Sequence, residues 1–229
     1  MKWSHDGLRF AVTSGAKCVP VCTYEHSHDW WICKMIKKKF KSTVLCCAFH
    51  PTNGQLLATG CADFKCRIVS TFASDVDGAN VDAGPFAALT GPQEFGEVYA
   101  EMSALGWIHA VAWAPSGRTL AYAAHDSAIY IATLGVSAEP TVQMVRLNDL
   151  PITTLLFLGD KALVGAGHDF NPLLLVRGGG YWGVHGFVDR DEDKGAVAAG
   201  VGESSVSKAR ELFKSKTRTG LDSKVCVWV

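Results

Sequence analysis

The feature that most constrains this chain is a three-strand unit, which is clearest in residues 106–134. Three apolar runs of strand length alternate there with two tight turns, Pro115-Ser116-Gly117 and His125-Asp126-Ser127. Pro presets the turn φ, Gly accepts a positive φ, and Asp can bond nearby backbone amides. Because the runs are apolar on both faces, we expect both faces of this small sheet to be covered. The runs lie at 108–113, 119–123 and 129–133.

Copies of the unit occupy residues 42–72 and 151–176, and a fourth copy begins at Lys2. The aromatic residues that end the first strands precede the turn aspartates by 14, 13 and 12 residues. A drifting period of roughly 45 residues with four strands per period is typical of a WD-type β-propeller. We therefore predict an all-β, WD40-type β-propeller of four to five blades. The aromatic–aspartate pairs are Phe49 and Asp63, Trp113 and Asp126, and Phe157 and Asp169.

Each predicted blade also needs an outer fourth strand. The sequence places these strands at 30–36, 95–101, 142–147 and 181–188. The loose Ala-, Asp-, Gly- and Pro-rich stretch 73–94 is long for a propeller loop. The predicted organisation is propeller blades over 1–188, a flexible insert over 189–220, and one strand of a last blade over 221–229.

The insert contains the one convincing helical pattern of the sequence, at 203–216. Ser204 or Ser205 can cap its start, and Gly220 is a suitable stop. Its narrow apolar stripe has two interpretations: it anchors the helix in a partner's groove, or it folds back on the propeller. The stripe consists of Val206, Ala209, Leu212 and Phe213.

Five lysines cluster where the first blade ends. They form either a patch for phosphate or an acidic partner, or a solvated connection between blades. The formal net charge of the whole chain is zero, so no bulk attraction to nucleic acid or anionic membrane is expected. The cluster consists of Lys34, Lys37, Lys38, Lys39 and Lys41.

Catalytic and metal-binding interpretations find little support. His125-Asp126 and His168-Asp169 occupy the same turn of successive blades, which favours aspartates that hold the turn by backbone hydrogen bonds. No CxxC pair, Walker loop, GxSxG or HExxH motif is present, so we expect no cofactor, no metal and no catalytic residue. With no apolar run near membrane-span length and no signal-peptide pattern, we expect an intracellular protein without membrane insertion and with reduced cysteines.

Several segments also resemble a known family, the WD-repeat subunit 1 of the actin-related protein 2/3 complex. The resemblance covers most of residues 2–229, and the 203–216 pattern resembles a helix that the family inserts before its last blade. The family forms a seven-bladed ring, so the resemblance implies that the first two blades, the start of the third and the first two strands of the last blade are missing. The segments are residues 29–34, 41–45, 62–68, 106–109, 125–127 and 166–169.

The resemblance implies a non-enzymatic scaffold in the cytoplasmic actin cytoskeleton. Its partners would be the other subunits of the complex, the mother actin filament and nucleation-promoting factors, and it would support filament nucleation and branching. Two alternatives stay open from the residues: a WD-repeat adaptor with other partners, and a propeller enzyme that uses the His-Asp turns.

Overall fold

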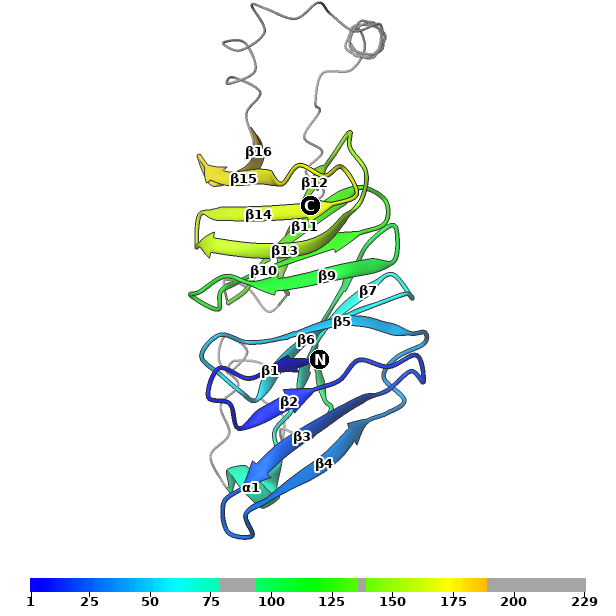
Figure 1. Ribbon diagram of the computed structural model, residues 1–229, viewed down its shortest axis with the longest axis vertical. Coiled ribbons are helices and arrows are strands. Elements are labelled where there is room, and N and C mark those ends of the chain that lie inside the picture. Colours follow the sequence, from blue (N-terminus) through cyan, green and yellow to red (C-terminus); the bar gives the residue numbers. More distant parts are fainter. Residues whose placement is uncertain (79–93, 136–138, 189–229) are drawn as a thin grey trace, which may run out of the picture.

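The computed structural model describes residues 1–78, 94–135 and 139–188. These residues form four antiparallel sheets, each made of four consecutive strands. The sheets follow one another in sequence order along the long axis of the molecule (Figure 1). This arrangement confirms the predicted all-β propeller blades.

The strand bounds of the first two sheets are as follows. The first sheet contains β1 (Lys2–Trp3), β2 (Arg9–Ala11), β3 (Val19–Glu25) and β4 (Trp30–Ile36). The second contains β5 (Val44–Phe49), β6 (Leu56–Cys61), β7 (Lys65–Ser70) and β8 (Val98–Ser103). A single helical turn, α1 (Ser74–Asp77), lies between β7 and β8 in the sequence.

The third and fourth sheets repeat the same order, with the first strand of each sheet at one edge and the fourth at the other. The third contains β9 (Ile108–Trp113), β10 (Thr119–Ala124), β11 (Ala128–Thr133) and β12 (Thr141–Arg146). The fourth contains β13 (Ile152–Gly159), β14 (Ala162–Gly167), β15 (Leu173–Gly178) and β16 (Tyr181–Phe187).

Two details differ from the sequence prediction. The outer strand β8 begins at Val98 rather than at residue 95, because Gly96 has a φ of +80° and its N–H bonds the Ser70 carbonyl in a turn before the strand. The start of the loose stretch after residue 72 forms α1, and Asp77 at its end pairs with Arg9 of β2. Residues 79–93, the predicted 203–216 helix and the predicted 222–229 strand lie outside the described residues.

Three apolar cores hold the four sheets together, one between each pair of neighbours. Val21 and Leu57 lie in the core between the first and second sheets, and Ile68 and Tyr122 in the next one. The third core packs residues such as Leu163 against the other face of the third sheet. Every residue of β10 is buried, as the two-sided apolar pattern of this strand predicts.

Hydrogen bonds between sheets fix how the blades sit on one another. The indole N–H of Trp113 donates to the Ala48 carbonyl over 3.1 Å, and the His50 ring lies 3.1 Å from the Gly117 carbonyl oxygen. Gly117 has a φ of +71°, and a Cβ atom there would lie 2.1 Å from the His50 Nε2 atom. This turn therefore needs glycine both for its backbone angle and for the room that His50 occupies.

Candidate partner-binding surface

One end of the stack gathers most of the residues singled out by the sequence. In each antiparallel sheet, the turn between the second and third strands lies at the same end as the connection to the next sheet. Backbone hydrogen bonds join each such turn to the preceding connection, as from Ala62 N to Thr43 O and from His125 N to Trp107 O. We call this end the turn end. It contains the turns at 62–64, 125–127 and 168–170 and the connections 37–43, 104–107 and 147–151.

The turn aspartate of the second sheet is the most heavily bonded of the three. The Asp63 carboxylate accepts the backbone N–H groups of Lys41 and Lys65, each over 3.2 Å. It also pairs with the Arg67 guanidinium at 2.9 Å, and Arg67 is only 2% exposed. A second carboxylate, that of Glu101, lies 2.7 Å from Arg67. Asp63 thus joins its own turn, the preceding connection and a buried charge.

The other two turn aspartates make fewer bonds. Asp169 accepts the backbone N–H of Leu150 over 2.6 Å. Asp126 accepts the Tyr130 hydroxyl over 2.7 Å, and that hydroxyl in turn accepts the backbone N–H of Leu105 over 3.1 Å. In the third sheet a tyrosine therefore relays the link that the other sheets make directly. The other carboxylate oxygen of Asp126 is buried and has no hydrogen-bond partner among the described residues.

The residue after each turn aspartate has a left-handed backbone. The φ angles are +66° at Phe64, +56° at Ser127 and +57° at Phe170. Positive φ is uncommon for residues other than glycine, and unusual for large side chains. Both phenylalanines nevertheless direct their rings outward, since Phe170 is fully exposed and Phe64 is 43% exposed. The turn end thus displays two apolar rings on tightly constrained turns.

The lysine cluster is held at the same end on a connection anchored at both sides. Ile36 and Phe40 are buried in the core between the first and second sheets, and the Lys41 N–H bonds Asp63. Between these anchors the backbone turns sharply, with a φ of +63° at Lys38. In the described part of the chain, the exposed lysine side chains of this connection make no ion pair. They are Lys37, Lys38, Lys39 and Lys41, while Lys34 lies on β4 and is half-buried.

A group of rings lies at the third-sheet part of the turn end. The ring nitrogens of His109 and His125 are 2.9 Å apart, and Trp107 stacks on His125 with ring centroids 5.5 Å apart. Burial lowers the pKa of His109, and the nearby His125 and His168 lower it further. These surroundings therefore favour the neutral form of His109.

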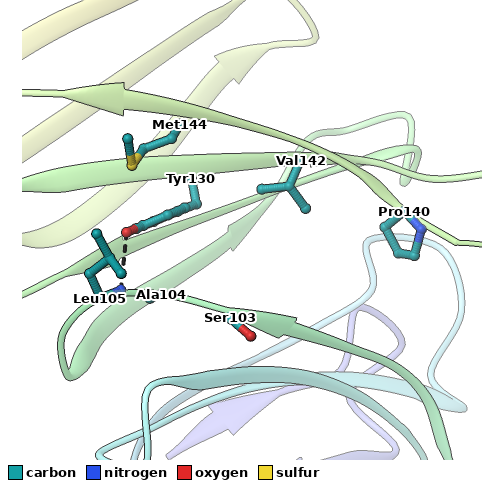
Figure 2. A pocket seen from close by; sticks show the side chains of 7 residues that line it. All are labelled: Ser103, Ala104, Leu105, Tyr130, Pro140, Val142 and Met144. Atoms are coloured by element: carbon teal, nitrogen blue, oxygen red, sulfur yellow. Dashed lines mark hydrogen bonds between the residues drawn. The ribbon is translucent and has the colours of Figure 1, made fainter. Parts of the chain in front are cut away.

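A pocket of about 360 Å³ opens between the second and third sheets, beside the Tyr130 relay (Figure 2). Its Tyr130 hydroxyl bonds the Leu105 backbone, as the dashed line shows, and Leu105 itself is largely exposed. Most of the lining is apolar, so the pocket suits an apolar side chain rather than a charged ligand. It is lined by Ser103, Ala104, Leu105, Tyr130, Pro140, Val142 and Met144.

The sequence located the turn aspartates and the lysines, and the structure places both sets at one end. The sequence did not indicate the pocket, since the lining combines the end of β8 and the connection after it with β11, Pro140 and β12 of the next sheet. The exposed rings of Phe64 and Phe170 could have been found by aligning the residue after each turn aspartate. The predicted helix stripe, Val206, Ala209, Leu212 and Phe213, lies outside the described residues.

Two kinds of site are absent from the residues that the structure describes. No three His, Cys, Asp or Glu side chains among them are arranged to hold a metal ion. In the same residues, no helix has the length and apolar character needed to cross a lipid bilayer.

Known proteins match most of the sequence, and a family model matches one repeat of it. The model of the family "WD domain, G-beta repeat" matches residues 31–70. That span runs from β4 to β7, so one sequence repeat contributes the outer strand of one sheet and three strands of the next. The repeat boundary and the sheet boundary are therefore offset by one strand.

Three relatives are named as subunit 1 of the actin-related protein 2/3 complex. The Schizosaccharomyces pombe protein is 40% identical over 80% of this chain and 48% of its own length. Subunit 1B of Arabidopsis thaliana is 38% identical over 97% of this chain and 58% of its own length. Subunit 1A-B of Xenopus laevis is 38% identical over 77% of this chain and 46% of its own length. The chain is thus a homologue of actin-related protein 2/3 complex subunit 1, and it spans about half the length of the relatives it matches.

Proposed function

We propose that this chain acts as a non-enzymatic scaffold subunit of an actin-related protein 2/3 complex. In this role it binds other subunits of that complex in the cytoplasm, at the actin cytoskeleton, and supports filament nucleation and branching. The observation that carries the proposal is the identity of 38–40% to relatives of that name over 80–97% of the chain. The four stacked blades supply the rigid framework that a scaffold needs.

The first experiment asks which proteins the full chain binds. A tagged copy is expressed in cells of its own source, and the proteins that co-purify with it are identified. We expect actin-related proteins and the remaining subunits of the complex. Recovery of an unrelated set of proteins in their place would instead identify a WD-repeat adaptor with other partners.

The turn end is the surface that we assign to acidic partner segments, such as those of nucleation-promoting factors. Three adjacent lysines, Lys37, Lys38 and Lys39, are exposed on a connection fixed by buried Ile36 and Phe40. An anchored backbone needs little ordering on binding, and the clustered positive charges favour recognition of carboxylates or phosphates. Each exposed ion pair contributes up to ~1 kcal/mol.

Charge reversal tests this assignment. Changing Lys37, Lys38 and Lys39 to Glu should weaken binding of an acidic partner by roughly one to two orders of magnitude. The matched control reverses three exposed cations at the opposite end of the sheets, Arg118, Lys161 and Arg177. Equal binding by both variants, measured by titration at low salt, would remove the lysines from the interface.

The helix predicted at 203–216 supplies a second proposed contact, to the mother filament. Truncation of an interface anchor typically costs at least ~2 kcal/mol, about 30-fold in affinity. Leu212→Ala combined with Phe213→Ala should therefore reduce co-sedimentation of the assembled complex with actin filaments and leave its melting temperature nearly unchanged. A large fall in melting temperature would indicate that the stripe packs on the propeller.

A further inference from the structure

The outer face of the first sheet carries an aromatic cluster that is partly exposed. Residues alternate along β3 and β4, so Val21 faces the second sheet while Tyr24 and Trp31 face outward. Trp31 contacts Trp3, Phe10 and Tyr24 with ring centroids 5.7, 5.2 and 5.3 Å away, respectively. The aromatic rings thus form one continuous surface across all four strands.

Two cysteines lie on this same face, directly opposite one another. Cys22 of β3 is the register partner of Cys33 of β4. Cys33 is exposed and Cys22 is half-buried, and both are free thiols. Their side chains hydrogen-bond each other. A reagent in solution can therefore reach Cys33 first and find Cys22 beside it.

The hydrogen-bond pattern shows which kind of cross-strand pair this is. Tyr24 N donates to Leu8 O over 2.9 Å, and Val12 N donates to Pro20 O over 3.0 Å. The backbone groups of residues 20, 22 and 24 therefore point toward β2, and those of the residues between them point toward β4. Cys22 and Cys33 consequently form a non-hydrogen-bonded pair, for which the Cα–Cα distance is about 4.5 Å. This distance falls within the range that a disulfide spans, about 4.4–6.8 Å.

We propose that Cys22 and Cys33 are a thiol–disulfide couple that reacts with low-molecular-weight disulfides such as glutathione disulfide. The Cys33 thiolate attacks one sulfur of glutathione disulfide, which releases one glutathione thiolate and leaves a mixed disulfide on Cys33. The Cys22 thiolate then attacks the Cys33 sulfur, which releases the second glutathione thiolate. Two protein thiols lose two protons and two electrons, and one glutathione disulfide becomes two glutathione thiols.

The surroundings of the two thiols fix the order of these steps. Burial, followed by the hydrogen bond and charge of Cys33, raises the pKa of Cys22 to about 12. Cys22 therefore stays protonated while Cys33 is a thiol. Once Cys33 is in a mixed disulfide, its contribution to the Cys22 pKa disappears, and Cys22 ionises more easily. The half-buried thiol is thus easier to ionise once its partner has reacted, while burial, the largest cause, continues to raise its pKa.

The other cysteines of the sheets are placed differently. Cys46 and Cys47 are adjacent in β5 and point to opposite faces. Burial raises the pKa of the Cys66 thiol, which lies in the core between the second and third sheets. These thiols are therefore internal standards that should stay unreacted in the folded chain.

The experiment exposes the full chain to glutathione disulfide, blocks the remaining thiols with iodoacetamide and measures the mass. We expect a loss of two hydrogen atoms, with a link between the proteolytic fragment that ends at Glu25 and the fragment that contains Cys33. Cys22→Ser should accumulate the glutathione adduct on Cys33, whereas Cys33→Ser should form neither link nor adduct at residue 22. Cys18→Ser, which alters a half-buried thiol just before β3, is the matched control and should behave like the parent.

Three results would overturn the proposal. The first is free Cys33 after treatment of the parent chain. The second is a link that joins Cys18 rather than Cys22 to Cys33. The third is a disulfide or glutathione adduct on Cys66 to the same extent as on Cys33, because the selectivity would then not arise from the fold. None of these outcomes depends on binding to actin or to any subunit, so the proposed function is tested separately.

Discussion

Removal of the Asp63 carboxylate should destabilise the protein far more than the same change in the other turns. Asp63→Ala deletes the acceptor of the Lys41 and Lys65 amides and one of the two carboxylates that bind Arg67. Arg67 is 2% exposed, so its charge cannot regain water without opening the sheet. Glu101 remains at 2.7 Å but is itself 44% exposed.

The magnitude follows from these contacts. Breaking a buried ion pair by removing one partner costs about 3–5 kcal/mol, and the remaining carboxylate near Arg67 reduces this to about 2–4 kcal/mol. Asp169→Ala removes one hydrogen bond, from the Leu150 amide to an exposed side chain, so we expect the free energy of unfolding to fall by less than about 1 kcal/mol. Asp126→Ala leaves the Tyr130 hydroxyl bonded to the Leu105 amide, and we expect about 1 kcal/mol. The three turns therefore share a backbone shape, but their aspartates contribute unequally to the stability of the protein.

Urea unfolding of the full chain, followed by tryptophan fluorescence, measures these differences. Asp63→Ala should lower the midpoint most while the m-value stays constant. The double variant Asp63→Ala with Arg67→Met removes both charges, and we expect it to be more stable than Asp63→Ala alone. If Asp63→Ala unfolded at the same urea concentration as Asp169→Ala, or if the second change added to the loss, the buried charge would not be the cause.

Two further predictions concern other contacts. Gly117→Ala should cost at least ~2 kcal/mol, because a left-handed L-residue is strained by roughly 1–2 kcal/mol and its Cβ would also displace His50; a thermal melt that matches the parent would contradict this. The pKa of His109 lies below its ordinary value of 6.5, chiefly through burial and then through His125 and His168. The unfolded chain therefore binds a proton at residue 109 more readily than the folded chain does. Protonation of His109 thus does not reduce the free energy of unfolding above about pH 6.5, and it lowers this free energy as the pH falls below that value. The melting temperature should fall between pH 7.5 and 5.5 by less in His109→Gln than in the parent.

Much of the fold could be predicted because its signals are local. The runs at 108–113 and 129–133 are strands since their length, apolar character and bounding turns agree. The start of β8 could not be predicted, because it depends on the bond from Gly96 to Ser70, which lies on another strand. Long-range bonds of this kind leave no periodic pattern in the sequence.

The candidate site divides in the same way. The turn aspartates recur at a regular spacing in the sequence. The number of hydrogen bonds that each one makes, however, depends on neighbouring side chains that differ from turn to turn. Arg67 lies four residues after Asp63, whereas Tyr130 occupies that place after Asp126. Cys22 and Cys33 face one another only because of the exact register between β3 and β4. The sequence does not fix the length of the turn between these two strands, so it does not predict that register.

The construction of each sheet from four consecutive strands bears on synthesis as well as on architecture. A blade of this kind closes its own hydrogen bonds as soon as its last strand has left the ribosome, without waiting for distant segments. Its apolar face, however, stays open until the next blade emerges and packs on it. We therefore expect folding to proceed along the nascent chain from the N-terminus. Proteolysis of ribosome-bound chains stalled beyond β8 should already find β5 to β7 protected, whereas uniform cleavage would show that the blades fold only together.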